Sequence, residues 1–100
     1  MASPQYLALS EAEQHDMIVQ TFLAQERDLF MYSLNVQRYE TILTTLDEPE
    51  YREHLLALLA TERAALVRQT HIVAATRQQL PEPGALQAAL LRLRAPQLAG

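Results

Sequence analysis

Apolar side chains recur at spacings of three and four residues along the stretch from His15 to Leu46. This spacing places them on one narrow face of an α-helix, because each turn takes about 3.6 residues. Two interleaved sets follow a heptad repeat: His15, Phe22, Leu29, Val36 and Leu43, then Ile18, Gln25, Tyr32, Tyr39 and Leu46. The pattern predicts a long helix that packs against a partner helix as in a coiled coil.

We expect this first helix to span residues 11–46. Ser10 and Glu13 form a capping-box pattern, because each side chain can accept a hydrogen bond from the other residue's backbone amide. A polar cluster with a proline at residues 47–49 interrupts the apolar pattern, and a second helix is expected over residues 49–80. The turn is so short that the two helices must be antiparallel neighbours.

The second helix has an apolar row of its own, but three of its heptad positions are polar. The row is Leu55, Leu59, Leu66, Val73 and Leu80, and the polar positions are Glu62, Gln69 and Thr76. These three either lie at the edge of a stripe widened by Leu58, Ala65 and Ile72, or are buried and fix the register at some cost in stability. Two registers remain open: one pairs Leu43 with Leu55, and the other, shifted by about one turn, sets Gln25 near Gln69.

Residues 81–100 begin with two prolines and a glycine, which end the second helix. A short amphipathic helix is expected over residues 85–94, followed by a tail, and residues 1–9 form a separate N-terminal segment. The predicted fold is all-α: a long antiparallel, coiled-coil-like helical hairpin over residues 10–80 with a short C-terminal helix. Oligomerisation is expected to complete this hairpin into a bundle.

The first helix carries a second apolar stripe, which a hairpin leaves uncovered because each helix buries only one face. Full burial of each large side chain in this stripe would contribute about 1.5–3 kcal/mol. The C-terminal helix, about 15 Å long, is too short to cover a stripe of about 33 Å. We therefore expect an interface that combines the stripe with the C-terminal leucines. Its residues are Val19, Leu23, Phe30 and Leu34, with Leu86, Leu90 and Leu93.

The expected partner is a second copy of the chain, because twofold homodimers are the commonest assemblies, or the helix of another protein. The net charge of −4 argues against nucleic acid, whose binding depends on attraction to phosphates. The longest apolar run covers residues 55–60, far short of the about 20 residues that span a bilayer. With no cysteine and no signal-peptide pattern, a cytoplasmic protein without membrane contact is expected.

No pattern in the sequence predicts catalysis, a cofactor or a metal site. Glu50, Glu53 and His54 lie within about one helical turn, but helical di-iron sites use Glu-x-x-His pairs and the chain has none. Phosphate-binding loops need glycine, and the first glycine is Gly84. We therefore expect the protein not to be an enzyme and to hold neither a cofactor nor a metal.

These patterns favour a non-enzymatic protein–protein interaction module that acts through apolar helix faces. An assembly factor, a small chaperone, an inhibitor and a structural subunit all fit this description. One alternative is a small DNA-binding transcriptional regulator, because residues 63–80 imitate the apolar spacing of a helix-turn-helix and carry arginines. The other alternative is a helical metal-binding protein.

Overall fold

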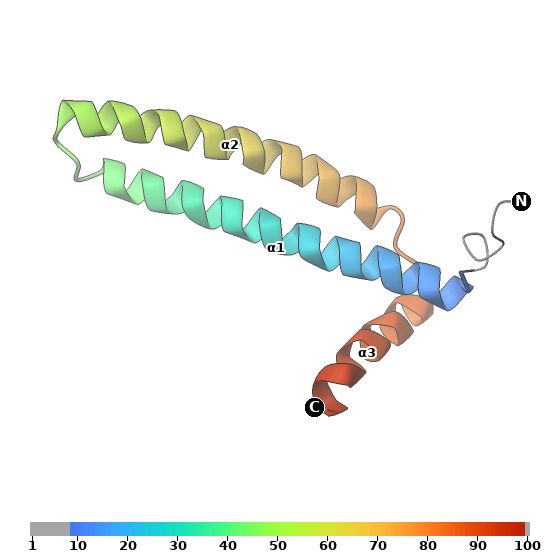
Figure 1. The fold of residues 1–100 in the computed structure, drawn as a ribbon. Coiled ribbons are helices and arrows are strands. Elements are labelled where there is room, and N and C mark those ends of the chain that lie inside the picture. The colour runs from blue at the N-terminus through green and yellow to red at the C-terminus, as the bar shows by residue number, and fades with distance from the viewer. Residues whose placement is uncertain (1–8, 100) are drawn as a thin grey trace, which may run out of the picture. The chain divides into compact units, whose positions relative to one another are not determined.

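The computed structural model describes the backbone of residues 9–99 and the side chains of residues 9–94. Over this range the chain forms three helices and no strand: α1 spans Glu11–Leu43, α2 spans Pro49–Arg77 and α3 spans Pro83–Ala99 (Figure 1). The predicted all-α fold with a helical hairpin is confirmed. The N-terminal segment expected at residues 1–9 lies outside the described residues, apart from Leu9.

Helix α1 begins at the predicted capping box. The Glu13 amide donates to Ser10 Oγ over 3.1 Å, and the Ser10 amide donates to Glu13 Oε1 over 3.3 Å. The helix ends at Leu43, before the expected residue 46, because threonine hydroxyls take over its last carbonyls. Thr44 Oγ1 donates to the Thr41 carbonyl over 2.6 Å, and the chain leaves the helix in a turn.

Helices α1 and α2 each run through two compact units of the chain. Unit 2 comprises Gln25–Ala74, and unit 1 comprises the described residues up to Ala24 and from Ala75 on. In unit 2 the two helices lie side by side and antiparallel, joined by the turn at residues 44–48 (Figure 1). The Arg52 guanidinium closes this turn, since its Nη1 donates to the Leu43 carbonyl over 2.8 Å and to the Leu46 carbonyl over 3.2 Å.

The core of unit 2 is the seam between α1 and α2. Its buried apolar residues are Val36, Leu55, Leu59 and Val73, and the heptad positions of α1 in this unit are otherwise half-buried. At the border of the seam, Arg63 Nη2 forms an ion pair with Glu40 Oε2 over 3.0 Å. The heptad pattern of the sequence therefore identified the side of α1 that faces α2.

Two of the polar heptad residues of α2 enter this seam. Gln69 is only 9% exposed, and its Nε2 donates to the Gln25 carbonyl over 3.0 Å. Glu62 is half-buried and accepts a hydrogen bond from Asn35 Nδ2 over 3.4 Å. Gln69 thus bonds the Gln25 backbone, while Glu62 bonds Asn35, the neighbour of Val36. Leu58 and Ile72, which would have widened the apolar stripe, are exposed.

In unit 1, the first part of α1 packs against α3. The most fully buried side chains there are Val19 on α1 and Ala89 on α3. Helix α3 begins at Pro83, earlier than expected, because proline has no amide to leave unpaired at a first helical position. The Glu82 carboxylate caps this end, accepting from the Ala85 amide over 2.9 Å. The backbone stays helical to Ala99, where a tail was expected.

We predict that Leu59→Ala lowers the free energy of unfolding by about 2–5 kcal/mol, because it leaves a cavity in the seam. Leu59 is 3% exposed, whereas its neighbour Leu58 is 43% exposed and serves as the matched control. Leu58→Ala should cost less than about 1 kcal/mol. Urea unfolding followed by circular dichroism, at one fixed protein concentration, checks both values. Equal losses for the two variants would contradict the assignment of the seam.

Candidate interaction surfaces

The structure divides the predicted interface residues between the two units. In unit 1, Val19 is 1% exposed, so the chain itself already covers it, while Leu23 and Leu90 remain partly open to solvent. Leu23, Leu90 and Leu93 come together with Arg94 around a hollow of about 370 Å³. Leu86 is half-buried. These leucines thus lie on the side of α3 that faces α1. They are next to the second apolar stripe of α1, with which they were combined in the interface predicted from the sequence.

An arginine anchors α3 to α1 within unit 1. Arg92 Nη2 donates to Asp16 Oδ1 over 2.8 Å, and Arg92 Nε lies 3.0 Å from the same oxygen. The Nη2 also lies 3.4 Å from the Ala12 carbonyl oxygen, which it bonds as donor. The hydrogen bond to Asp16, together with the charge of that carboxylate, raises the pKa of Arg92 against a smaller opposing effect of desolvation. Both side chains stay partly exposed, so the anchor is open to solvent.

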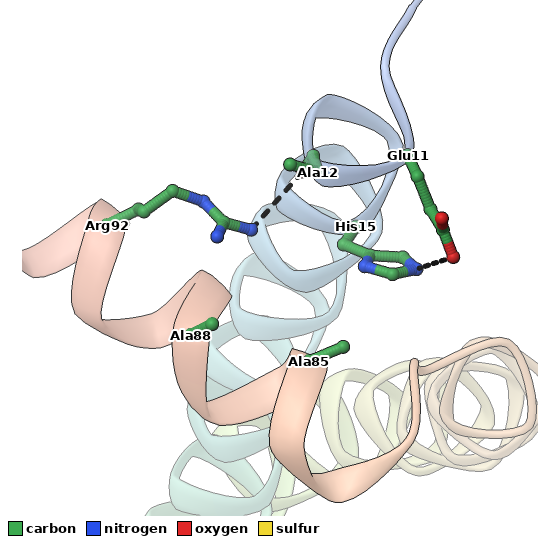
Figure 2. A pocket seen from close by; sticks show the side chains of 6 residues that line it. All are labelled: Glu11, Ala12, His15, Ala85, Ala88 and Arg92. Carbon is green, nitrogen blue, oxygen red and sulfur yellow. Dashed lines mark hydrogen bonds and ion pairs between the residues drawn. The ribbon is translucent and has the colours of Figure 1, made fainter.

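Small side chains leave a second hollow, of about 310 Å³, between the starts of α1 and α3. Figure 2 shows Ala85 and Ala88 of α3 facing the first turns of α1, with Arg92 to one side and His15 to the other. His15 Nε2 lies 3.9 Å from Glu11 Oε1, a contact that becomes an ion pair only when the histidine is protonated. Three of the six lining residues are alanines and the Arg92 guanidinium is engaged with Asp16, so this hollow is interpreted as a gap left by small side chains between the two helices.

The outward face of α1 in unit 2 has no neighbour among the described residues of that unit. Phe30 on this face is 64% exposed, and Met31 beside it is also exposed. One turn further along, α1 carries a hollow of about 390 Å³. Its lining residues are Leu34, Gln37, Arg38, Thr41 and Ile42. This face combines a protruding aromatic ring with a depression in the same helix.

Thr41 is the shortest side chain that lines the hollow on α1. The Thr41 hydroxyl donates to the Gln37 carbonyl over 2.8 Å, so this short side chain turns back onto its own helix instead of standing out from it. Leu34 is half-buried and closes the N-terminal side, while Arg38 is exposed at the rim. No ion pair or side-chain hydrogen bond is found for Arg38 within the described part of the chain.

Helix α2 exposes apolar residues that the sequence reasoning did not single out as an interface. They lie outside its heptad row, so the hairpin seam has no room for them. The most exposed are Tyr51, Leu56 and Val67. A search for apolar residues outside the heptad row would have found them. It would not have shown whether they or Phe30 are more exposed to solvent.

The segments considered for other chemistry are simple helix in this structure. Helix α2 runs without a break through residues 63–77, where a helix-turn-helix needs a turn, and Arg63 is engaged with Glu40. Glu50 and His54 line a hollow of about 250 Å³ with Tyr51. Within residues 9–94, no three side chains of the metal-binding types gather around one point. None of the described helices combines the length and the apolar character that crossing a bilayer requires.

No protein-family model, no curated protein and no solved structure matches this chain. A proposal about function therefore rests on the surfaces, charges and packing of the chain itself. Among these, the outward face of α1 in unit 2 offers the largest exposed side chain of the predicted interface, Phe30.

We predict that the Asp16–Arg92 anchor keeps α3 on α1. The charge reversals D16R and R92D should each speed amide hydrogen exchange in residues 83–94, because a short helix without its packing partner is only marginally stable. The double variant D16R/R92D should recover most of the protection. Exchange measured by mass spectrometry checks this, with R94D as a control of equal charge change. Equal acceleration by R94D would show that charge alone, and not the anchor, is responsible.

Proposed function

We propose that this chain is a non-enzymatic protein–protein interaction module that associates with a second copy of itself through the outward face of α1 in unit 2. The observation that carries the proposal is Phe30, a large aromatic side chain that is 64% exposed, the most exposed large apolar side chain of α1 among the described residues. Large exposed apolar side chains that cluster on one face mark interaction sites more often than single scattered ones do. Met31 and the hollow beginning at Leu34 extend this face along the helix.

Energetics favour covering this face. Complete burial of an aromatic or methionine side chain contributes about 1.5–3 kcal/mol, and aromatic residues are enriched at the centres of protein interfaces. In a symmetric dimer both copies contribute the same residues to the interface, so each such side chain is buried once in each copy. Two copies of this face therefore have a driving force of several such contributions, reduced by the entropy lost on association.

As part of the proposal, the module acts as an assembly factor, a small chaperone, an inhibitor or a structural subunit in the cytoplasm. The absence of cysteine is compatible with a reducing compartment. A self-association face on a chain of 100 residues suits each of these roles, since none requires a catalytic group. A helix from a different protein is the other occupant that this face would accept.

We expect Phe30→Asp to abolish self-association, because it removes the largest apolar side chain of the face from both copies and puts a short, hydrated carboxylate in its place. The molar mass should be measured by light scattering after size exclusion over a hundredfold range of concentration. The wild-type mass should rise from 11.3 kDa toward twice that value, whereas the variant should stay monomeric with unchanged helix content by circular dichroism.

Val67→Asp is the matched control for this experiment. Val67 is exposed to a similar degree, in the same unit, but on α2. It should associate as the wild type does. A wild-type chain that stays monomeric throughout the range would contradict self-association, and an equal effect of both variants would contradict the choice of face.

A further inference from the structure

The hollow on α1 has the geometry of a coiled-coil hole. In knobs-into-holes packing, one side chain of a helix enters a space formed by four residues of the facing helix. Those four residues lie at positions i, i+3, i+4 and i+7, because these are neighbours on a helix surface. Leu34, Gln37, Arg38 and Thr41 have this spacing, and together with Ile42 they line the hollow of about 390 Å³. No described residue of unit 2 enters it as a knob.

Phe30 is the matching knob. It stands on the same face of α1, one turn before Leu34, so it cannot turn back into the hollow of its own helix. A knob and a hole at a fixed offset on one helix face are self-complementary under a twofold axis across the helix. With Phe30 opposite residues 37 and 38 of the partner helix, that axis passes beside Leu34.

We propose that two copies of the chain pair α1 with α1 in antiparallel orientation, with Leu34 near the twofold axis and each Phe30 seated in the other copy's hole of Leu34, Gln37, Arg38 and Thr41. This proposal rests on the self-association proposed above and specifies its geometry. Both knobs and both holes are filled at once, which a helix of unrelated sequence would not achieve.

Charge selects the antiparallel orientation over the parallel one. In a parallel pair in register, Arg27 would face Arg27, Arg38 would face Arg38, and the like charges would repel. The two Phe30 rings would also meet each other, leaving both holes empty. In the antiparallel pair, Arg27 lies opposite Thr41, and the guanidinium of Arg38 lies beside the Phe30 ring of the other copy.

An arginine over an aromatic face is a favourable contact, because the cation is attracted to the electron-rich ring. This chain already contains one such contact, in unit 1: the Arg77 guanidinium carbon lies 5.7 Å from the centre of the Phe22 ring. Arg38 is available for the same role, since it has no ion pair among the described residues. The hole thus offers Phe30 both an apolar floor and a cationic rim.

The contribution of Arg38 can be measured separately from that of the apolar contact. We expect Arg38→Gln to weaken the dimer about tenfold, because two cation–π contacts are lost while the hole keeps most of its shape. Arg68→Gln, which removes an exposed arginine from α2, is the control and should leave the dissociation constant unchanged. Sedimentation equilibrium gives both constants. Equal weakening by the two variants, or none by Arg38→Gln, would overturn the assignment of Arg38 to the hole.

Disulfide trapping tests the orientation, because the natural chain has no cysteine and any introduced thiol is the only one. Cysteines can bridge only when their Cα atoms come within about 7 Å. Under mild oxidation, Leu34→Cys should form a covalent dimer with itself. Arg27→Cys and Thr41→Cys should each crosslink poorly alone, yet a mixture of the two should give mainly the mixed dimer, which mass spectrometry identifies.

The outcomes separate this geometry from self-association itself. A wild-type dimer by light scattering in which Arg27→Cys crosslinks efficiently to itself would mean parallel pairing, and would overturn the proposed geometry alone. A dimer in which Leu34→Cys fails to crosslink would mean that copies associate through another face, which would overturn both the geometry and the choice of the α1 face. A wild-type chain that is monomeric at all concentrations would overturn both proposals.

Discussion

A helix with a single neighbour can bury only one face, and this constraint shapes the whole of α1. In unit 2 its neighbour is α2, and Val36 and the half-buried heptad residues meet it there. Phe30 points away from that neighbour. In unit 1 the same helix is joined to α3 by the Asp16–Arg92 ion pair, and Val19 is buried there. The chain therefore covers part of the second face of α1 by itself, whereas Phe30, Met31 and Ile42 of unit 2 stay exposed.

The seam of unit 2 gives up some stability to fix its register. An entirely apolar seam would let the helices slide by a turn at little cost, whereas the bond from Gln69 to the Gln25 carbonyl is satisfied in one register. The arrangement also buries the Gln25 Oε1 atom without a hydrogen-bond partner among the described groups, at a cost of about 1–3 kcal/mol. A fixed register also fixes the rotation of α1, and with it the direction in which Phe30 points.

The sequence predicted those parts of the fold that depend on local or periodic signals. The Ser10–Glu13 box marked the start of α1, and the heptad repeat marked its inner face. The end of α1 was placed too late, because threonine is compatible with a helix interior and its hydroxyl contacts decide the outcome. Pro83 and Gly84 were interpreted as helix breakers, yet they occupy the first turn of α3. Proline is tolerated there, and the Glu82 carboxylate accepts hydrogen bonds from the amides of Gly84 and Ala85.

The candidate surface could be predicted only in outline. Phe30 was identified from its spacing, but the hollow beyond it is lined partly by the polar side chains of Gln37, Arg38 and Thr41, which a search for apolar periodicity passes over. Val19 on α1 and Ala89 on α3 are both buried in unit 1. Contacts made by residues as small as alanine leave little mark on a hydrophobic pattern, so the sequence could not show which residues of α3 would be buried.

The contacts that hold each unit together join residues at different separations along the chain. These separations set an order of folding. In unit 2, Arg52 reaches a carbonyl 6 residues away and Gln69 one 44 residues away, so the hairpin can close from its turn outward through progressively longer loops. In unit 1, Asp16 can form its ion pair only after Arg92, 76 residues later in the chain, has been synthesised. During synthesis, Asp16 therefore lacks this ion pair until α3 has left the ribosome, and the nascent chain passes through a state in which the first part of α1 is not yet anchored to α3 and is open to other helices.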